Sequence, residues 1–543
     1  MSERSSVLAP FRHETFRLLW LATLVSNLGG LVQSVGAGWM MTTLTDSHNM
    51  VALVQASTTL PIMVFSIAAG ALADNFDRRI VMLIAQSAMM VISIALAVMA
   101  LMGLLTPWLL LGFTFLIGCG TALFNPSWQA SMGDIVPRPD LPGAVTLNSM
   151  GFNMMRSVGP AVGGLIVAFA GAASAFAMNA VSYIPLIFAL TRWKPERPAA
   201  RLPREDFASA MWAGVRYVSL SPNLTTVLFR GFLFGLAAVS VLALLPSIAG
   251  EYVGGGALVY GTLLGCFGLG AIGGAFLNGM VREHYSNEVI VRLACVGFAI
   301  ACVGLGFSRN PILSHFVLLP AGACWVLALS LFNVSIQLSS PRWVVGRALS
   351  LYQTATFGGM AAGSWIWGVS ADAFGPDWAL AMAAAVLLVC ALVGFKLPLP
   401  QFNSNDLNPL DTFNEPILKL DLRPRSGPIM VMIDYQVDQD DIPKFLGLMA
   451  ERRRIRIRDG ARQWALLRDL EKPDTWVESY HVPTWIDYVR HNLRRTKADA
   501  ENINQLRAMH RGDGTPQVHR MIERQTVPLD DDTPLRDTPE VPN

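Results

Sequence analysis

Long stretches without a charged residue dominate the chain between Phe16 and Lys396. One runs from Val51 to Ala69, and the next from Ile80 to Met102. A helix needs about 20 mainly apolar residues to cross the hydrocarbon core of a bilayer. By this measure we predict twelve membrane-spanning helices, centred near residues 30, 61, 91, 119, 157, 181, 237, 269, 299, 325, 359 and 387.

Composition supports this prediction and limits where it applies. Charged residues make up 15% of the chain, whereas soluble domains carry roughly 25%. The deficit ends near residue 427, after which the charge density is that of a soluble domain. We therefore expect a membrane region followed by a small soluble domain.

Positive charge divides the connections between the spans into two classes. The odd-numbered connections lack Lys and Arg, except for Arg309. Positively charged connections stay in the cytoplasm, so we predict a multi-pass protein of the bacterial cytoplasmic (inner) membrane with both termini inside. The positive residues of the even-numbered connections are Arg78, Arg79, Arg138, Arg192, Lys194, Arg197, Arg201, Arg204, Arg216, Arg282, Arg342 and Arg347.

The membrane region contains an internal repeat. "FNPSWQ" at 124–129 recurs as "FNVSIQ" at 332–337, an offset of 208 (332 − 124). Both halves have six spans, so they share one orientation and are related by an axis along the membrane normal. We predict six-helix bundles at 1–191 and 224–396, joined by a cytoplasmic linker at 192–223. Further matches, at an offset of 204, pair Gly159 with Gly363, Gly164 with Gly368, and Gly70, Asp74 and Arg78 with Gly274, Asn278 and Arg282.

The connection between the second and third spans reads "GALADNFDRR". It resembles the GxLxDrxGRR motif of the major facilitator superfamily, with Asp77 where that motif has glycine. The resemblance implies the twelve-helix fold of that superfamily and a cytoplasmic latch that must break during transport. The alternative is a simple topology signal. The residues assigned to this latch are Gly70, Asp74, Arg78 and Arg79, with Asp134 and Arg156 as a possible nearby pair.

Two further stretches narrow the resemblance. "GPAVGG" is similar to the GPxxGG motif of drug–proton antiporters, although close helix packing explains it equally well; its residues are Gly159, Pro160, Gly163 and Gly164. The stretch 124–164 resembles the enterobactin-exporter-like branch, also called transmembrane secretion effectors. Thr114 stands where many drug exporters have an arginine, so proton coupling through that arginine is unsupported.

Polar residues inside the spans are candidates for a substrate cavity, because such residues are costly in lipid. In each FNxSxQ copy the Asn and Gln are four residues apart, hence on one helical face. The alternative is hydrogen bonding between helices. The candidates are Asn27, Gln33, Asn125, Gln129, Arg230, Asn333 and Gln337.

These features predict a secondary active transporter, not an enzyme. We expect proton-coupled efflux of a small organic molecule, such as a siderophore or drug, by alternating access through the lipid bilayer. No Walker sequence is present for ATP hydrolysis. We expect no metal, cofactor or nucleic-acid partner. The alternatives are an uptake carrier with the same fold and a membrane-tethered enzyme that acts through the C-terminal domain.

After a linker at 397–427, residues 428–525 read as a β-α-β-β-α-β domain, an order that is ferredoxin-like. The domain resembles the dimeric antibiotic-biosynthesis monooxygenase type, which implies a possible homodimer. His481, His491 and Trp485 are the residues that would suit catalysis, but dimerisation or regulation is the favoured role. Residues 526–543 are rich in Asp and Pro, a composition that favours disorder.

Overall fold

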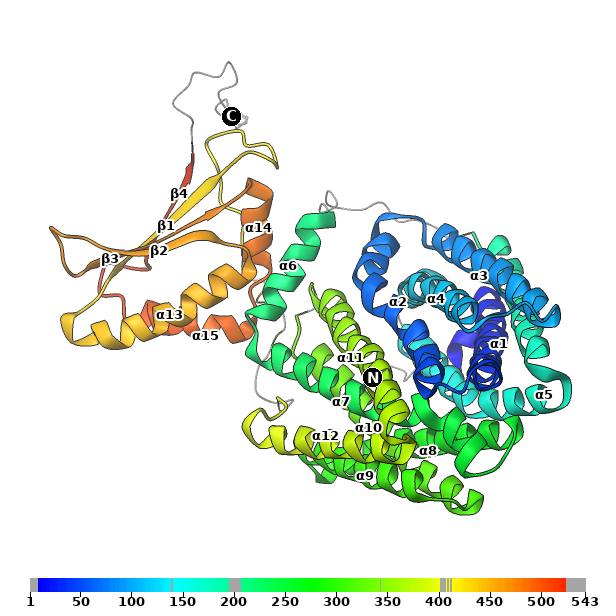
Figure 1. Cartoon of the computed structure of the whole chain (residues 1–543). Coiled ribbons are helices and arrows are strands. Elements are labelled where there is room, and N and C mark those ends of the chain that lie inside the picture. The colour runs from blue at the N-terminus through cyan, green and yellow to red at the C-terminus, as the bar shows by residue number, and fades with distance from the viewer. Residues whose placement is uncertain are drawn as a thin grey trace. The chain divides into compact units, whose positions relative to one another are not determined.

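The computed structural model describes residues 8–137, 140–194, 207–341, 343–400, 407, 410 and 413–523 (Figure 1). Arg138, Arg342 and the tail 526–543 lie outside the described residues, as do the side chains around Gly70 and Asp74. The chain forms two compact units. The first comprises Met1–Phe207, Thr225–Ile336 and Gly346–Gln401; the second comprises Ala208–Leu224, Gln337–Val345 and Phe402–Asn543.

The first unit is a helical membrane bundle. Of the described helices, nine are long and apolar enough to cross a membrane, judged by length and composition alone. Helices α2 and α11 have comparable lengths. Helix α5 breaks at Gly171, where φ is 79°, and so supplies two spans. The helices are α1 (Glu14–Leu44), α2 (His48–Asn75), α3 (Arg78–Leu101), α4 (Pro107–Ile135), α5 (Leu141–Arg192), α7 (Pro222–Ser247), α8 (Ala257–His284), α9 (Asn287–Phe307), α10 (Pro311–Leu338), α11 (Val345–Phe374) and α12 (Pro376–Lys396).

The predicted centres all fall within these helices, and the prediction of a polytopic helical protein is confirmed. Helices α1–α5 form one half of the bundle and α7–α12 the other, and α5 packs along α8 between them (Figure 1). We call the end of the bundle with the odd-numbered connections the odd-loop end, and the opposite end the even-loop end.

The internal repeat is visible in the packing of equivalent glycines. Gly118 on α4 faces α2, where a Cβ would lie 3.2 Å from the Thr58 carbonyl oxygen. Gly322 lies 204 positions later (322 − 118) on α10 and faces α8, where a Cβ would lie 1.8 Å from the Phe267 carbonyl oxygen. The two halves therefore place a side-chain-free position at the same kind of helix crossing.

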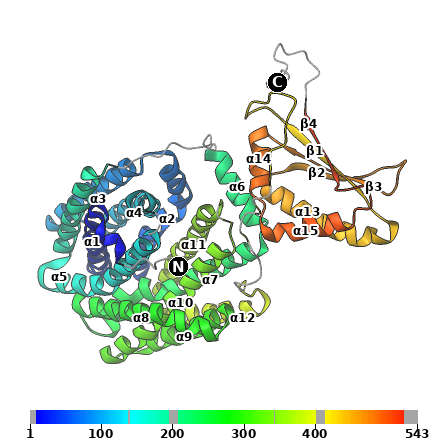
Figure 2. The ribbon, with the colours of Figure 1, turned by 180° about the vertical axis from the view of Figure 1, so that it is seen from behind.

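The second unit contains a four-stranded antiparallel sheet with the strand order β2-β3-β1-β4 (Figure 2). This order supports the ferredoxin-like prediction for the sheet. The single helix expected near residues 484–510 is in fact two helices, because Thr496 starts a new one with a capping box to Asp499. The elements are β1 (Ile429–Gln436), α13 (Ile442–Asp459), β2 (Arg462–Arg468), β3 (Thr475–Val482), α14 (Trp485–Leu493), α15 (Lys497–Ala508) and β4 (Gln517–Ile522).

The same unit includes helix α6 (Phe207–Ser219) and the connection 337–345 between α10 and α11. The Tyr217 ring meets the Trp343 ring edge-on at 5.4 Å. Arg494 lies 4.1 Å above the Trp343 ring, and Arg458 lies 4.9 Å from the Tyr217 ring. The C-terminal domain therefore packs on two even-numbered connections, a contact that the sequence analysis did not predict.

Candidate functional site

Arg156 on α5 and Trp325 on α10 meet between the two halves of the bundle. The guanidinium carbon lies 5.6 Å from the centre of the Trp325 ring. Arg156 is the sixteenth residue of α5, and Trp325 is thirteen residues from the end of α10. At 1.5 Å per residue, both lie about 20 Å from the even-loop end, which is deep in a membrane span.

Aromatic rings surround Trp325 on the side of the second half. Its ring centre lies 6.2 Å from that of Phe234, 5.9 Å from Phe267 and 6.2 Å from Phe298. Trp325 is 3% exposed, and its indole nitrogen has no hydrogen-bond partner within the described part of the chain. Trp325 therefore belongs to a buried aromatic cluster, and Arg156 contacts its ring.

Arg156 carries a charge that the described residues do not neutralise. A charge at the centre of a span costs roughly 2.5–3.5 kcal/mol on insertion scales, and a cation–π contact returns only about 0.5–2 kcal/mol. We predicted that Arg156 lies near Asp134, but Asp134 pairs with Arg78 instead, at 2.8 Å. The position can therefore attract an acidic ligand that also carries an aromatic or apolar group.

Five of the six amide candidates are at least partly exposed. Asn125 and Gln129 lie on one exposed side of α4, Gln337 is also exposed, and Asn27 and Asn333 are half-buried. A polar side chain that is exposed within a span faces a water-filled cavity more readily than lipid. Their role in a substrate cavity stays a prediction.

Gln33 instead takes part in helix packing. It accepts a hydrogen bond from Asn179 in the second part of α5. The Asn179 amide also lies 3.2 Å from the Ser93 hydroxyl and 3.1 Å from the Tyr183 hydroxyl. Asn179 was not among the predicted residues, although an asparagine within an apolar run was the available signal.

Arg230 on α7 is fully buried and ion-paired with Glu288 on α9. Glu288 also accepts from Arg292 at 2.9 Å and from the backbone nitrogen of Leu399 at 2.9 Å. This network ties α7, α9 and the end of α12 together, so Arg230 does not join the Arg156 contact. Glu288 was not predicted from the sequence, although its spacing of four residues from Arg292 was the available signal.

At the even-loop end, the arginines of the "GALADNFDRR" motif bind neighbouring helices. Arg78 donates to Asp134 and, at 3.0 Å, to the carbonyl oxygen of Ala130 on α4. Arg79 donates to the carbonyl oxygens of Leu190 and Thr191, both at 2.8 Å. Asp77, the departure from the motif, caps α3 by accepting from the Arg79 backbone nitrogen. The described contacts thus brace the first half internally.

At the odd-loop end, contacts join the two halves directly. Asp372 at the end of α11 accepts from the Ser47 hydroxyl at 2.9 Å and from the Asn49 backbone nitrogen at 3.3 Å. The Trp39 and Tyr260 rings stack at 6.5 Å. Asp372 therefore places a negative charge at the N-terminus of α2, where the helix dipole favours it.

The "GPAVGG" glycines allow α5 to approach two helices. A Cβ at Gly159 would lie 2.7 Å from Leu31 of α1, and one at Gly163 would lie 3.0 Å from the Val32 Cα. A Cβ at Gly164 would lie 2.6 Å from the Gly261 Cα on α8. The packing interpretation of the motif accounts for these contacts. One of them, between Gly164 and Gly261, is a direct backbone contact between the two halves.

Two further residues depart from expected patterns in the sequence. Thr114 stands where many drug exporters have an arginine, and Arg309 is a positive residue in an odd-numbered connection. Thr114 is buried and hydrogen-bonds to the Ser57 hydroxyl at 2.6 Å, so it joins α4 to α2. Arg309 lies 3.8 Å from the Tyr252 ring and 3.6 Å from the Asp377 carboxylate. That carboxylate offsets the one positive charge in the odd-numbered connections.

Replacing Asp372 with alanine is expected to weaken closure at the odd-loop end. A charge at a helix N-terminus contributes about 1 kcal/mol, or about a fivefold change in a two-state equilibrium. Double electron–electron resonance between labels at Thr43 and Ile312 would show a larger population of long distances. Asp46→Ala is the matched control, since Asp46 is an exposed acid in the same connection as Ser47. An unchanged distance distribution in Asp372→Ala would contradict this prediction.

Comparison with known proteins points to transport. Residues 5–526 match a family described as "Transmembrane secretion effector". The chain is 25% identical to the staphyloferrin A transporter of Staphylococcus aureus over 358 residues, which cover 64% of this chain and 87% of that protein. It is 26% identical to the enterobactin exporter EntS of Escherichia coli O127:H6 over 410 residues, which cover 73% and 96% respectively.

Solved structures of transporters share the fold of the membrane bundle. A bacterial homolog of the human lysosomal transporter Spinster, inward-facing and occupied, superposes with a TM-score of 0.56 at 13% identity, covering 72% of this chain and 97% of that one. The D-xylose-proton symporter superposes with a TM-score of 0.56 at 14% identity, covering 70% and 98%.

Proposed function

Because the chain belongs to the transmembrane secretion effector family, we propose that it exports a small acidic siderophore by alternating access. The chain is a multi-pass membrane transporter with the major facilitator fold. The observation that carries the choice of substrate is the unneutralised Arg156 over Trp325 at membrane depth. A siderophore must offer oxygen donors to ferric iron, and such donors commonly ionise, which suits this arginine.

The contacts between the halves support a loading step from the even-loop end. The halves touch at the odd-loop end through Asp372 with Ser47, and through Gly164 with Gly261. In this conformation a substrate would enter from the even-loop end and reach Arg156. Breaking the odd-loop contacts would then release it on the other side. The bundles at 1–191 and 224–396 are the proposed moving parts.

We assign the even-loop end to the cytoplasm and the odd-loop end to the outside of the inner membrane. Arginines gather in the even-numbered connections, and positive charge stays inside. The C-terminal domain packs on two of these connections through Trp343 and Tyr217, so it shares their side. Proton coupling is proposed because the chain has no Walker sequence for ATP hydrolysis. Protons would have to pass by residues other than the one at position 114, where threonine replaces the arginine of many drug exporters.

The C-terminal domain has a proposed role in dimerisation and regulation. Helices α13–α15 cover one face of the sheet (Figure 2). The register places Met430 beside Met521, and Val477 beside Leu467, on the opposite face. Leu467 and Met521 are each 50% exposed. A second copy of the domain that packed there would cover these apolar side chains.

Deleting residues 428–543 is expected to leave most of the export in place. The Arg156 contact and both sets of end contacts lie outside the deleted segment. Intracellular and secreted enterobactin and staphyloferrin A would be measured in cells with no transporter, the full chain or the truncated chain. Export predicts less siderophore inside and more outside when the transporter is present.

Two other outcomes would overturn this proposal. A rise in intracellular siderophore with the full chain would indicate uptake. Complete loss of activity with the truncated chain, at normal membrane levels, would favour an enzyme acting through the C-terminal domain. Leu470→Ser, in the β2–β3 turn, is a control for altering the domain without removing it. Leu470 is 98% exposed, so this variant should export like the full chain.

A further inference from the structure

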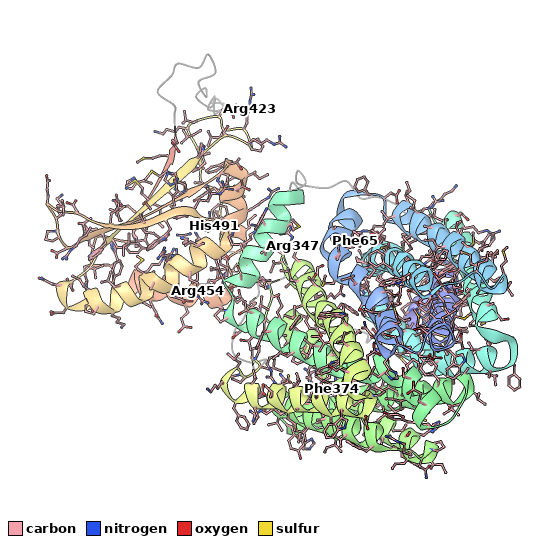
Figure 3. The ribbon with its side chains drawn as sticks, in the orientation of Figure 1. Phe65, Arg347, Phe374, Arg423, Arg454 and His491 are labelled. Atoms are coloured by element: carbon pink, nitrogen blue, oxygen red, sulfur yellow. The ribbon has the colours of Figure 1, made fainter. Side chains whose placement is uncertain are left out.

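Three arginines lie together inside the C-terminal domain, and we call Arg452, Arg456 and Arg495 the arginine cluster. Arg452 and Arg456 come from successive turns of α13 and are 4% and 1% exposed. Arg495 follows α14 and is half-buried. His491 on α14, labelled in Figure 3, contacts the cluster, since its Nε2 lies 3.0 Å from an Arg456 Nη1.

Within the described residues, one carboxylate contacts this cluster. Glu478 on β3 accepts from Arg456 Nε at 2.9 Å and from the Trp464 indole nitrogen at 3.1 Å. Arg452 Nε lies 3.6 Å from the same oxygen. Burial alone would raise the pKa of Glu478, but the charges of Arg456 and Arg452 hold it at about 2. Glu478 is therefore ionised at neutral pH.

The charges do not balance. Burial, and then repulsion from Arg456, lowers the pKa of His491 well below its ordinary value, so this histidine is neutral. Burial and the charge of Arg456 also lower the pKa of Arg495 to about 10, which leaves it charged at neutral pH. Three positive charges thus face one negative charge, an excess of two in a largely buried region.

Several hydrogen-bond donors in the cluster have no partner. These atoms are buried nitrogens, and each can donate a hydrogen bond to an oxygen acceptor. Buried charges and donors without partners are strongly unfavourable, so the arrangement needs something that offsets its cost. The atoms without a hydrogen-bond partner, among those the structure describes, are Arg452 Nε, Arg456 Nη2 and Arg495 Nε.

We propose that the arginine cluster binds a small molecule carrying two negative charges on oxyanion groups, such as a dicarboxylate or a phosphate. Two such charges would balance the excess. Guanidinium groups bind carboxylate and phosphate oxygens in paired hydrogen bonds, and neutral His491 adds a further polar contact. Arg495, the half-buried member, lies where the ligand enters.

The site adjoins the contact between the domain and the membrane connections. Arg494, the residue before Arg495, lies over the Trp343 ring. Arg458, two residues after Arg456, lies over the Tyr217 ring. A ligand in the cluster would therefore bind residues that neighbour Arg494 and Arg458 in the sequence, and these two arginines contact the connection 337–345 and α6. The proposal does not depend on which substrate the membrane bundle carries.

Isothermal titration of the purified full chain in detergent, at fixed ionic strength, tests the proposal. The probes are succinate, inorganic phosphate and the neutral analogue succinamide. We expect saturable binding of one or both anions and none of succinamide, and the ratio of the two affinities shows whether carboxylate or phosphate is preferred. Failure of both anions to bind would overturn the proposal.

Variants separate a specific site from general charge attraction. Arg495→Gln should weaken anion binding at least tenfold, and the protein should fold because Arg495 Nε has no hydrogen-bond partner among the described residues. Arg456→Gln should do the same, with the thermal midpoint measured to check folding. Arg453→Gln is the matched control, since Arg453 is an exposed residue of the same helix. Equal loss of binding in Arg453→Gln and Arg495→Gln would contradict the proposal.

Without ligand, the variants carry a second signature. Arg495→Gln removes a positive charge that repels Arg456, so the thermal midpoint of the ligand-free protein should stay the same or rise. Adding the bound anion should raise the midpoint of the unaltered chain and leave that of Arg495→Gln nearly unchanged. A large fall in the midpoint of ligand-free Arg495→Gln would show that Arg495 has a structural role instead.

Discussion

Replacing Arg156 with glutamine is expected to reduce export of an acidic siderophore by about 10- to 100-fold, because a hydrogen bond to a charged group contributes about 1.5–3 kcal/mol. Arg156 lies over Trp325 and has no carboxylate partner among the described residues. Its charge is therefore available to the substrate. The measurement is the initial rate of siderophore release from preloaded cells, normalised to transporter in the membrane.

Controls distinguish substrate binding from damage to the fold. Arg156→Lys keeps the charge but loses the planar guanidinium, so it should retain part of the export. Arg192→Gln changes an arginine at the other end of α5, where it lies 4.5 Å from the Phe188 ring, and should have little effect. Normal export by Arg156→Gln would contradict the assigned role, as would an equal loss in Arg192→Gln.

Features that depend on local patterns could be predicted from the sequence. The twelve spans follow from the length of each apolar run, and the ferredoxin-like order follows from strand and helix periodicities in residues 428–525. The internal repeat was also readable, since Gly159 and Gly363, like Gly164 and Gly368, stand 204 positions apart in the sequence. The break within α5 fell between two predicted spans, at Gly171.

The site could be predicted only in part, because its contacts join residues far apart in the sequence. Arg156 was recognised as a buried charge, but nothing local shows that Trp325 lies beneath it. Asp372 and Ser47 are 325 positions apart, and their pairing depends on how the halves meet. Arg230 was expected near the substrate, and its pairing with Glu288 followed from neither residue alone.

The soluble domain shows the same limit. Its strands and helices were predicted from the sequence, but the linker 192–223 was predicted to be separate from the domain. Helix α6, within that linker, belongs to the same compact unit because Tyr217 packs against Trp343. His491 and Trp485 were considered as catalytic residues. In the structure Trp485 donates to Glu415 at 3.0 Å, and His491 contacts Arg456, and neither contact could be read from the sequence.

Replacing Gly261 with alanine is expected to abolish most export without loss of the protein from the membrane. A Cβ at Gly261 would lie 2.4 Å from the Gly164 Cα and 2.9 Å from the Pro160 carbonyl oxygen. These are backbone atoms, so no side chain can move aside. The halves must separate at the odd-loop end, and the transporter loses the closed conformation from which it loads. Labels at Thr43 and Ile312 should report longer distances.

Gly273→Ala is the matched control, because it makes the same change on the same helix at a position where a Cβ meets nothing within 4 Å. Alanine is the better helix former by about 1 kcal/mol, so Gly273→Ala should export normally and be at least as stable. If Gly261→Ala also exported normally, the Gly164–Gly261 contact would not belong to the transport cycle. If both variants failed equally, the cause would lie in α8 itself and not in the approach of the two halves.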